Sequence, residues 1–193
     1  MLSYEVVRRA IEFGRPERLP MRFDVLGIND VQEVDRNQIG AGDITKRETF
    51  DEWGCRWVRS EITNMGQVKG HPLENWAALG SYEWPDPDDP RLYEDMESRF
   101  EGSNGKYVLT RIFMLLFERM HSLRGMENVL MDFHLERKRI EMLADRIVEY
   151  DLAIIRNISE QFPGQIHGFC FSDDWGTEKN TFISPILWRD FFK

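Results

Sequence analysis

The segment from Ile166 to Pro185, IHGFCFSDDWGTEKNTFISP, places two adjacent carboxylates directly after an apolar stretch. These acids are Asp173 and Asp174, and Trp175 follows them. A carboxyl group at the end of a strand can donate a proton when burial raises its pKa, or bind a cationic group when it stays ionised. An Asp pair before a glycine is also a common turn and helix-capping arrangement. The pair is therefore a candidate catalytic site with a structural alternative.

The expected strand over 165–172 directs the two acids to different sides. Side chains alternate along a strand, so Asp174 shares a face with the small residues Gly168 and Cys170, whereas Asp173 shares the face of the phenylalanines. The face with the smaller side chains is expected to point inward. We therefore expect Asp174 to be the pocket carboxylate and Asp173 to point toward the loop, unless the strand twists or bulges there.

Other residues with chemical potential are more scattered. Arg111, near the end of an expected strand, could bind a substrate carboxylate, although a salt bridge at a strand end is the more ordinary role. His167 and Cys170 have a metal-like spacing, but residues i and i+3 of a strand face opposite sides, so one zinc ion does not easily reach both. His71 and His121 have no partner at a ligand spacing. The sequence contains no G-x-G-x-x-G, P-loop or G-x-S-x-G motif.

Hydrophobic periodicity and turn residues predict the elements that must position these groups. Helices are expected at 3–13, from the Asp89-Pro90 start onward, at 114–125, over 134–162 as one helix or two, and from Pro185. Strands are expected at Leu19 to Val25, 106–113 and 165–172, and 51–59 with 66–73 is typical of a hairpin or strand pair. The segment 129–133 is ambiguous.

The alternation of strand and helix over the second half predicts βα units and a parallel sheet. In folds of this kind the chemistry lies at the carboxyl ends of the strands. Asp173 and Asp174 lie at such an end. No linker divides the chain, so we expect a single domain.

Composition limits the classes of partner. The chain has 193 residues with a formal net charge of −9, and no cluster of Lys and Arg stands out, so nucleic acid is not an expected partner. The longest apolar run, Ile112 to Phe117, is far too short to span a bilayer, so a membrane is not expected either. Two cysteines imply no disulfide framework, and the N-terminus has no signal-peptide pattern. These features favour a cytoplasmic protein.

Three spaced blocks resemble the uroporphyrinogen decarboxylase superfamily, which includes corrinoid-dependent methyltransferases. The blocks are FGRPERLP at 13–20, HSLRGMENVLMD at 121–132 and GFCFSDDWGTEKNTFISPILWRDFFK at 168–193. The resemblance implies a (β/α)8 barrel with its active site at the C-terminal face. The expected fold is α/β, the N-terminal portion of such a TIM barrel, truncated at about half of the barrel. Residues 1–193 would form a single partial domain.

Departures from the decarboxylase pattern favour the methyltransferase branch. The decarboxylases hold the propionates of their substrate with arginines shortly after the first strand, whereas the corresponding segment here, FDVLGIND at 23–30, has none. They also place a Tyr after the third strand, and the comparable IFMLLFERM lacks one. The position that matches their strand-end Ser is Asp173. The DEWG and DDWG blocks look more like methyltransferase-type members.

The resemblance therefore implies that the full-length protein is an enzyme of methyl transfer involving a corrinoid or a methylated small molecule. Asp174 and Asp173 are the candidate catalytic residues. Arg111, Trp175 and Asp24 are the candidate substrate-binding residues.

Cofactors and partners follow from the same resemblance. Methyltransferase-type members use zinc or a corrinoid, and their zinc ligands lie in the C-terminal half, so no cofactor is expected within this chain. The expected partners are a small-molecule or corrinoid substrate and a corrinoid protein. A homo-oligomer would cover the exposed sheet edges of a half-barrel. Two alternatives stay open: uroporphyrinogen decarboxylase itself, in tetrapyrrole biosynthesis, and a catalytically inert half-barrel fragment.

Overall fold

The computed structural model describes residues 1–40, 46–60 and 66–193, apart from the side chain of Asp24. The chain divides into two compact units, and each is described by itself. The first unit comprises 1–37, 87–112 and 152–171, and the second comprises 38–86, 113–151 and 172–193. The expectation that they form a single domain stays a prediction.

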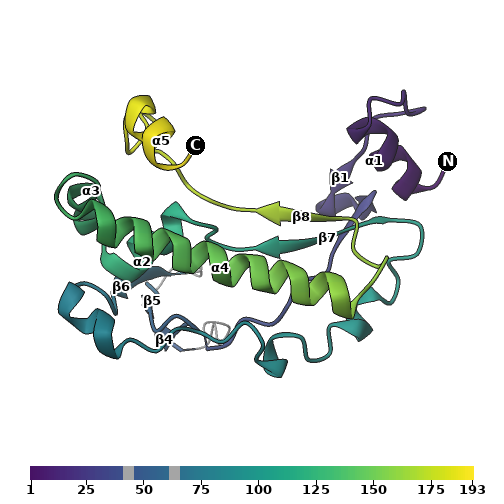
Figure 1. Cartoon of the computed structure of the whole chain (residues 1–193). Coiled ribbons are helices and arrows are strands. Elements are labelled where there is room, and N and C mark those ends of the chain that lie inside the picture. The colour runs from purple at the N-terminus through teal and green to yellow at the C-terminus, as the bar shows by residue number, and fades with distance from the viewer. Residues whose placement is uncertain (41–45, 61–65) are drawn as a thin grey trace. The chain divides into compact units, whose positions relative to one another are not determined.

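The first unit is built on a three-stranded parallel sheet in the order β3-β7-β8, visible in Figure 1. Its strands are β3 (Val31–Glu33), β7 (Tyr107–Ile112) and β8 (Gly168–Phe171). Alternate side chains of β7 are buried, as the pleat of a strand with one covered face requires. The parallel pairing predicted for the second half of the chain is confirmed for β7 and β8.

Shorter elements complete this unit. Helix α1 (Ser3–Ile11) is supported on its exposed face by ion pairs between Glu5 and both Arg8 and Arg9. Strands β1 (Arg22–Phe23) and β2 (Ile28–Asn29) pair antiparallel around the 3-10 turn η1 (Asp24–Leu26). The helix expected after Asp89 consists instead of two 3-10 turns, η3 (Pro90–Leu92) and η4 (Glu97–Phe100), although Asp89 does cap the first of them.

The second unit contains an antiparallel sheet in the order β4-β5-β6. Its strands are β4 (Glu48–Phe50), β5 (Arg56–Val58) and β6 (Gln67–Gly70), so the strand pair predicted over 51–59 and 66–73 is confirmed. The 3-10 helix η2 (Trp76–Ser81) follows. The helices are α2 (Phe117–Arg124), α3 (Met126–Leu135) and α5 (Pro185–Phe191), and Ser184 caps α5 through a hydrogen bond from the backbone N–H of Leu187.

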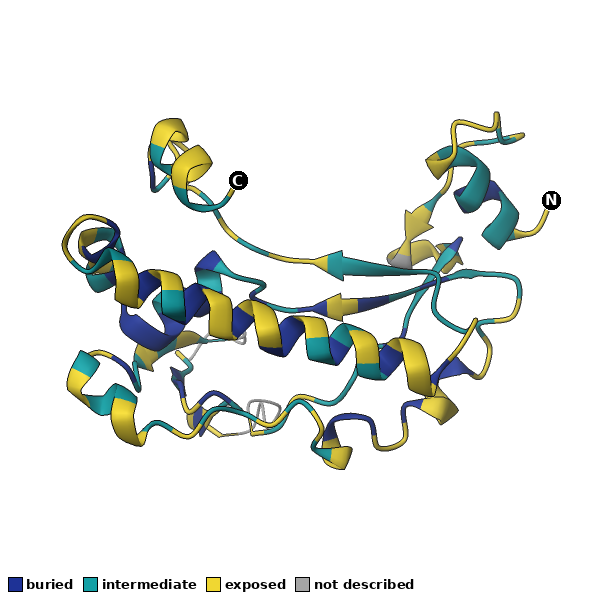
Figure 2. Ribbon diagram, in the orientation of Figure 1, coloured by how far each residue is buried: buried dark blue, intermediate teal, exposed yellow. Residues whose placement is uncertain are grey.

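Gly125 separates α2 from α3. Its φ of 88° is unfavourable for a residue with a side chain, so glycine permits the two helices to follow each other directly. The ambiguous segment 129–133 therefore belongs to a helix. Helix α4 (Arg137–Gln161) is a single helix that contributes to both units, with a buried stripe of isoleucines and leucine on one side, dark blue in Figure 2: Ile140, Leu143, Ile147, Ile154 and Ile158.

The expected half-barrel is wrong. The described residues form small sheets of two or three strands, two of them antiparallel, and no series of parallel strands that curves toward a barrel. The strand expected at Leu19 to Val25 shrinks to two exposed residues, and it pairs with β2 rather than with the parallel sheet. The apolar residues of this segment suggested a buried strand, but both residues of β1 are exposed to solvent.

Among the residues that the structure describes, no helix combines the length and the apolar character that crossing a membrane requires.

Candidate functional site

Asp173 directs its carboxylate to the first turn of α2, in the second unit. The backbone N–H of Phe117 donates to Oδ2 at 3.0 Å, and that of Glu118 donates to Oδ1 at 2.7 Å. The first N–H groups of a helix have no partner within the helix, so a carboxylate from another segment satisfies them. Burial nevertheless raises the pKa of Asp173, because desolvation outweighs these hydrogen bonds. The structural alternative, helix capping, is thus present at Asp173, and its catalytic role stays a prediction.

Ser172 fixes the segment that carries the acids. Its carbonyl oxygen accepts a hydrogen bond from the backbone N–H of Leu115 at 2.9 Å, and its Oγ accepts one from the backbone N–H of Met114 at 3.2 Å. The chain before α2 and the chain after β8 are therefore tied together one residue before the acid pair. This places Asp173 at the helix N-terminus without a flexible connection.

Glu118 joins the two predicted acids. The backbone N–H of Asp174 hydrogen-bonds the Glu118 carboxylate, in return for the hydrogen bond that the Glu118 amide gives to Asp173. Burial raises the pKa of Glu118, and the charges of Asp174 and then of Asp173 raise it further. Asp174 itself is exposed. Three acidic residues therefore lie at the start of α2, and burial holds the two half-buried ones, Glu118 and Asp173, toward their protonated forms.

His121 lies one helical turn after Glu118, so both side chains are on the same face of α2. Burial lowers the pKa of His121 to about 4, and the neighbouring His71 acts in the same direction. The ring packs edge-on against Phe117, with centroids 5.4 Å apart. His121 is thus a neutral imidazole at physiological pH, able to accept or donate one hydrogen bond.

Sequence reasoning missed Glu118 and His121. It treated His121 as a histidine without a partner at a useful spacing, although Glu118 precedes it by three residues. A Glu-x-x-His pattern inside a predicted helix is the signal that could have found the pair, because i and i+3 positions are neighbours on a helix surface. The spacing of residues in the sequence could not show that the N-terminus of α2 lies beside the acid pair Asp173 and Asp174.

Trp175 connects the acids to an apolar cavity. Its ring stacks on Phe117, with centroids 5.0 Å apart and planes 15° apart. It also lines a cavity of about 270 Å³ together with Ile183, Trp188 and Arg189. The aromatic walls suit a small apolar molecule, and Arg189 adds one cation at the edge. Trp175, predicted to bind substrate, is therefore positioned between a cavity and the start of α2.

Arg111 belongs to the first unit and is described separately from the acids. Its guanidinium contacts Asp35 through Nη2 at 2.6 Å and Nε at 2.9 Å, and Glu33 lies 3.5 Å from Nε. The hydrogen bonds to Asp35 raise the pKa of Arg111 above its usual value. The salt bridge expected as the ordinary role of this strand-end arginine is confirmed. A substrate carboxylate would have to displace Asp35, so the binding role stays a prediction. The side chain of Asp24 lies outside what the structure describes.

Over the described ranges, no three His, Cys, Asp or Glu side chains are grouped so that they could hold a metal ion. His167 accepts a hydrogen bond from the backbone N–H of Val108 at Nδ1, at 2.8 Å, which occupies one of its two possible ligand atoms. The described residues therefore present no set of three such side chains for a zinc ion.

No protein-family model, curated protein or solved structure matches this chain. The superfamily resemblance therefore rests on the three sequence blocks alone.

Proposed function

We propose that this chain belongs to an enzyme of the uroporphyrinogen decarboxylase superfamily that transfers a methyl group from a methylated small molecule, with a corrinoid as acceptor substrate. Glu118 is the residue that carries the proposal. It is a half-buried carboxyl whose pKa is raised beside Asp174, so it retains a proton closer to neutral pH than an ordinary glutamate.

The chemistry gives this proton a use. When a methyl group leaves an oxygen, nitrogen or sulfur atom, the bond breaks with its electron pair on the heteroatom, while the methyl carbon bonds to the acceptor. A positioned acid that protonates the departing heteroatom raises the rate, typically by a factor of about 10² to 10⁴. Glu118 is suited to be this acid. Asp174, which is exposed, would orient the substrate or return the proton.

The cavity beside Trp175 supports a small donor. A volume of about 270 Å³ is just below the usual range for drug-sized ligands, so it suits a smaller molecule and is too small for a corrinoid macrocycle. We therefore assign it to the methylated molecule, with its apolar part against Trp175 and Trp188. The corrinoid supplies the nucleophile from outside this cavity.

Uroporphyrinogen decarboxylation is less well supported. Its substrate carries several carboxylates, and three carboxyl groups at the start of α2 would repel them. Arg111, the arginine expected to bind a substrate carboxylate, already binds Asp35 within the first unit.

The test measures methyl transfer to cob(I)alamin from three donors: a methyl ether, a methylamine and a methyl thioether. The change in the visible spectrum on methylation of cobalt reports the rate. We expect turnover with one of these donors, lower by about 10² to 10⁴ in Glu118→Gln. Turnover of the wild type should fall as pH rises through the raised pKa of Glu118, because the acid is lost.

Glu127→Gln is the matched control, because Glu127 is an exposed glutamate of the next helix, α3. It should retain wild-type turnover. Equal rates in Glu118→Gln and Glu127→Gln would remove Glu118 from the mechanism. Release of carbon dioxide from uroporphyrinogen, without methyl transfer from any donor, would favour the decarboxylase instead.

A further inference from the structure

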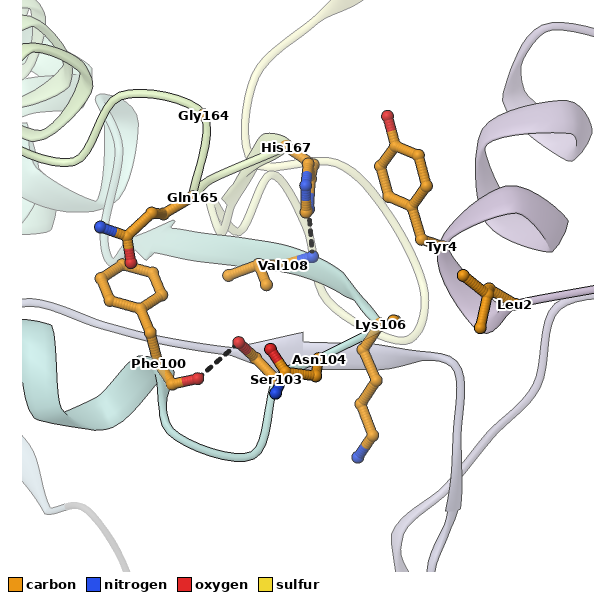
Figure 3. A pocket seen from close by; sticks show the side chains of 11 residues that line it. Leu2, Tyr4, Phe100, Ser103, Asn104, Lys106, Val108, Gly164, Gln165 and His167 are labelled. Carbon is orange, nitrogen blue, oxygen red and sulfur yellow. Dashed lines mark hydrogen bonds between the residues drawn. The ribbon is translucent and has the colours of Figure 1, made fainter.

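The first unit contains a cavity of about 390 Å³ at the amino-terminal ends of β7 and β8, and its lining includes Tyr4, Lys106, Gln165 and His167. Figure 3 shows that the polar ends of Tyr4, Lys106 and Gln165 point in different directions rather than toward one ligand position. The polar groups at the start of α2, in the second unit, are arranged differently, because their hydrogen bonds join two chain segments.

Helix α2 has no capping side chain of its own. The residue before it is Leu116, which makes no side-chain capping hydrogen bond. Leucine is a poor N-cap, because an N-cap side chain must accept a hydrogen bond from the first free amides of the helix. Asp173 supplies two acceptors from another segment: Oδ2 for the Phe117 N–H at 3.0 Å, and Oδ1 for the Glu118 N–H at 2.7 Å. The start of α2 therefore depends on a residue more than fifty positions away.

A hydrogen bond also runs in the opposite direction. The Glu118 carboxyl accepts it from the backbone N–H of Asp174, the residue next to Asp173. In a capping box, the cap side chain accepts from a helix amide while a helix glutamate accepts from the amide of the cap. A similar exchange occurs here between two distant segments. It fixes the backbone of Glu118 through one hydrogen bond and its carboxyl group through another.

Contacts on both sides of Asp173 hold its segment against the start of α2. Before it, the Ser172 carbonyl accepts a hydrogen bond from the Leu115 N–H at 2.9 Å. After it, the Trp175 ring stacks on Phe117, with centroids 5.0 Å apart. Trp175 also lines the cavity assigned to the methylated molecule. The segment that orients Glu118 therefore also forms part of the cavity wall.

We propose that Asp173 is a positioning residue, whose carboxylate holds the first turn of α2 so that the Glu118 carboxyl keeps the orientation set by the Asp174 N–H. Its consequence for turnover rests on the proposed role of Glu118 as proton donor, whereas the orientation can be measured without turnover. Asp173 needs no contact with the substrate in this role, because both of its carboxylate oxygens accept hydrogen bonds from the helix.

The first measurement is the kcat of methyl transfer in two variants of Asp173. Asparagine caps a helix about as well as aspartate does, whereas alanine has no acceptor. Asp173→Ala should lower kcat about 10- to 100-fold, because a small displacement of a reacting group has an effect of that size. Asp173→Asn should lower kcat by no more than about threefold, because it keeps an acceptor.

Two outcomes of this comparison would overturn the proposal. Equal losses in Asp173→Asn and Asp173→Ala would show that the charge of Asp173 takes part in the reaction itself. A loss of less than about threefold in Asp173→Ala would show that turnover does not depend on Asp173.

The second measurement follows Glu118 by NMR in the whole chain, labelled with 15N and with 13C at the glutamate side-chain carboxyls. The Glu118 signal is identified by its absence in Glu118→Gln. The Asp174 amide proton should shift at the pH where the Glu118 carboxyl titrates, because the two groups are hydrogen-bonded. Asp173→Asn should retain this shared transition, and Asp173→Ala should lose it. A shared transition that persists in Asp173→Ala would contradict the positioning role.

A double variant separates positioning from simple capping, and it replaces Asp173→Ala if that variant does not fold. Leu116→Ser adds a local capping hydroxyl, so combining it with Asp173→Ala should restore the melting temperature. It should restore neither kcat nor the shared transition, because the two segments stay unlinked. Recovery of either would show that Asp173 is only a helix cap. If the wild type transfers no methyl group from any donor, the proposed function fails, while the shared transition still decides the role of Asp173.

Discussion

The acids of this protein fall into two groups that differ in what neutralises them. Asp30, in the first unit, receives two hydrogen bonds of 2.6 Å from Arg18, and Asp132, in the second, is 2.7 Å from Arg124. Glu118 and Asp173 receive backbone N–H groups instead, and no arginine of the described chain forms an ion pair with them. Arginine-paired acids stabilise the fold, whereas the acids at the start of α2 keep unbalanced charge.

The pKa values show the consequence of this difference. The Arg18 guanidinium holds the pKa of Asp30 well below its usual range, although burial opposes it. Burial and neighbouring acids raise the pKa of Glu118. Both side chains are carboxyls removed from water, so the cation decides the sign. A carboxyl group whose pKa is raised lowers the stability of the fold near neutral pH, and such groups concentrate at functional sites.

The largest effect is expected from breaking the pair between Asp132 and Arg124, because both side chains are buried. Asp132→Asn should lower the free energy of unfolding by about 3 to 5 kcal/mol, since Arg124 would remain buried without its counter-charge. Urea denaturation measures this loss. Asp190→Asn is the control, because Asp190 pairs with Arg137 at the exposed surface and should cost less than about 1 kcal/mol. Equal losses in the two variants would contradict the difference between buried and exposed pairs.

Asp30→Asn should have the next largest effect, a loss of about 1.5 to 3 kcal/mol from charge-assisted hydrogen bonds. The folded-state pKa of Asp30 is lowered, so its contribution is present above the unfolded value of 3.8 and is lost as pH falls below it. Stability curves from pH 2 to 7 should therefore show a shallower acid limb in Asp30→Asn. Glu12→Gln, at the residue that follows α1, should leave that limb intact, because the pair between Glu12 and Arg8 is exposed. An identical limb in wild type and Asp30→Asn would refute this assignment.

Glu118→Gln should have the smallest effect on stability, and the opposite sign. The folded-state pKa of Glu118 is raised, so the folded state holds its proton above the unfolded value of 4.5, and stability declines as pH rises through the raised pKa. Removing the charge should therefore raise the melting temperature at pH 7. The free energy of unfolding should increase by less than about 1 kcal/mol. Thermal unfolding at pH 4 and pH 7 measures it. If Glu118→Gln melted at a lower temperature than the wild type at pH 7, the charged Glu118 would stabilise the fold, and this prediction would be wrong.

The local elements were predictable because neighbouring residues decide them. The stripe of α4, the strand β7, the cap at Asp89 and the helix from Pro185 are present where periodicity and turn residues indicated them. The segment around Leu19 was not predictable in the same way. Its apolar letters fit a buried strand, but burial depends on whether another layer covers the segment.

The candidate site also contains features that neighbouring residues decide and features that tertiary contacts decide. The sequence located Asp173, Asp174 and Trp175 at a strand end. Alternation directed Asp174 inward and Asp173 toward the loop, whereas the structure leaves Asp174 exposed and half-buries Asp173. The sequence could not show that Asp173 would be used by the N-terminus of α2, because that contact joins residues more than fifty positions apart. For the same reason, nothing in the sequence distinguished Glu118 from an exposed helical glutamate, and only the structure placed it beside the acid pair.

By itself, the sequence determined α1, α2, α4 and α5, the parallel pairing of β7 with β8, and the presence of two carboxylates after β8. Only the tertiary structure decided that the parallel sheet stops at three strands, that Asp30 has an arginine and Glu118 does not, and that His167 carries its proton on Nε2. Secondary structure follows from interactions a few residues apart. Charge balance, burial and tautomer depend on which distant segments meet.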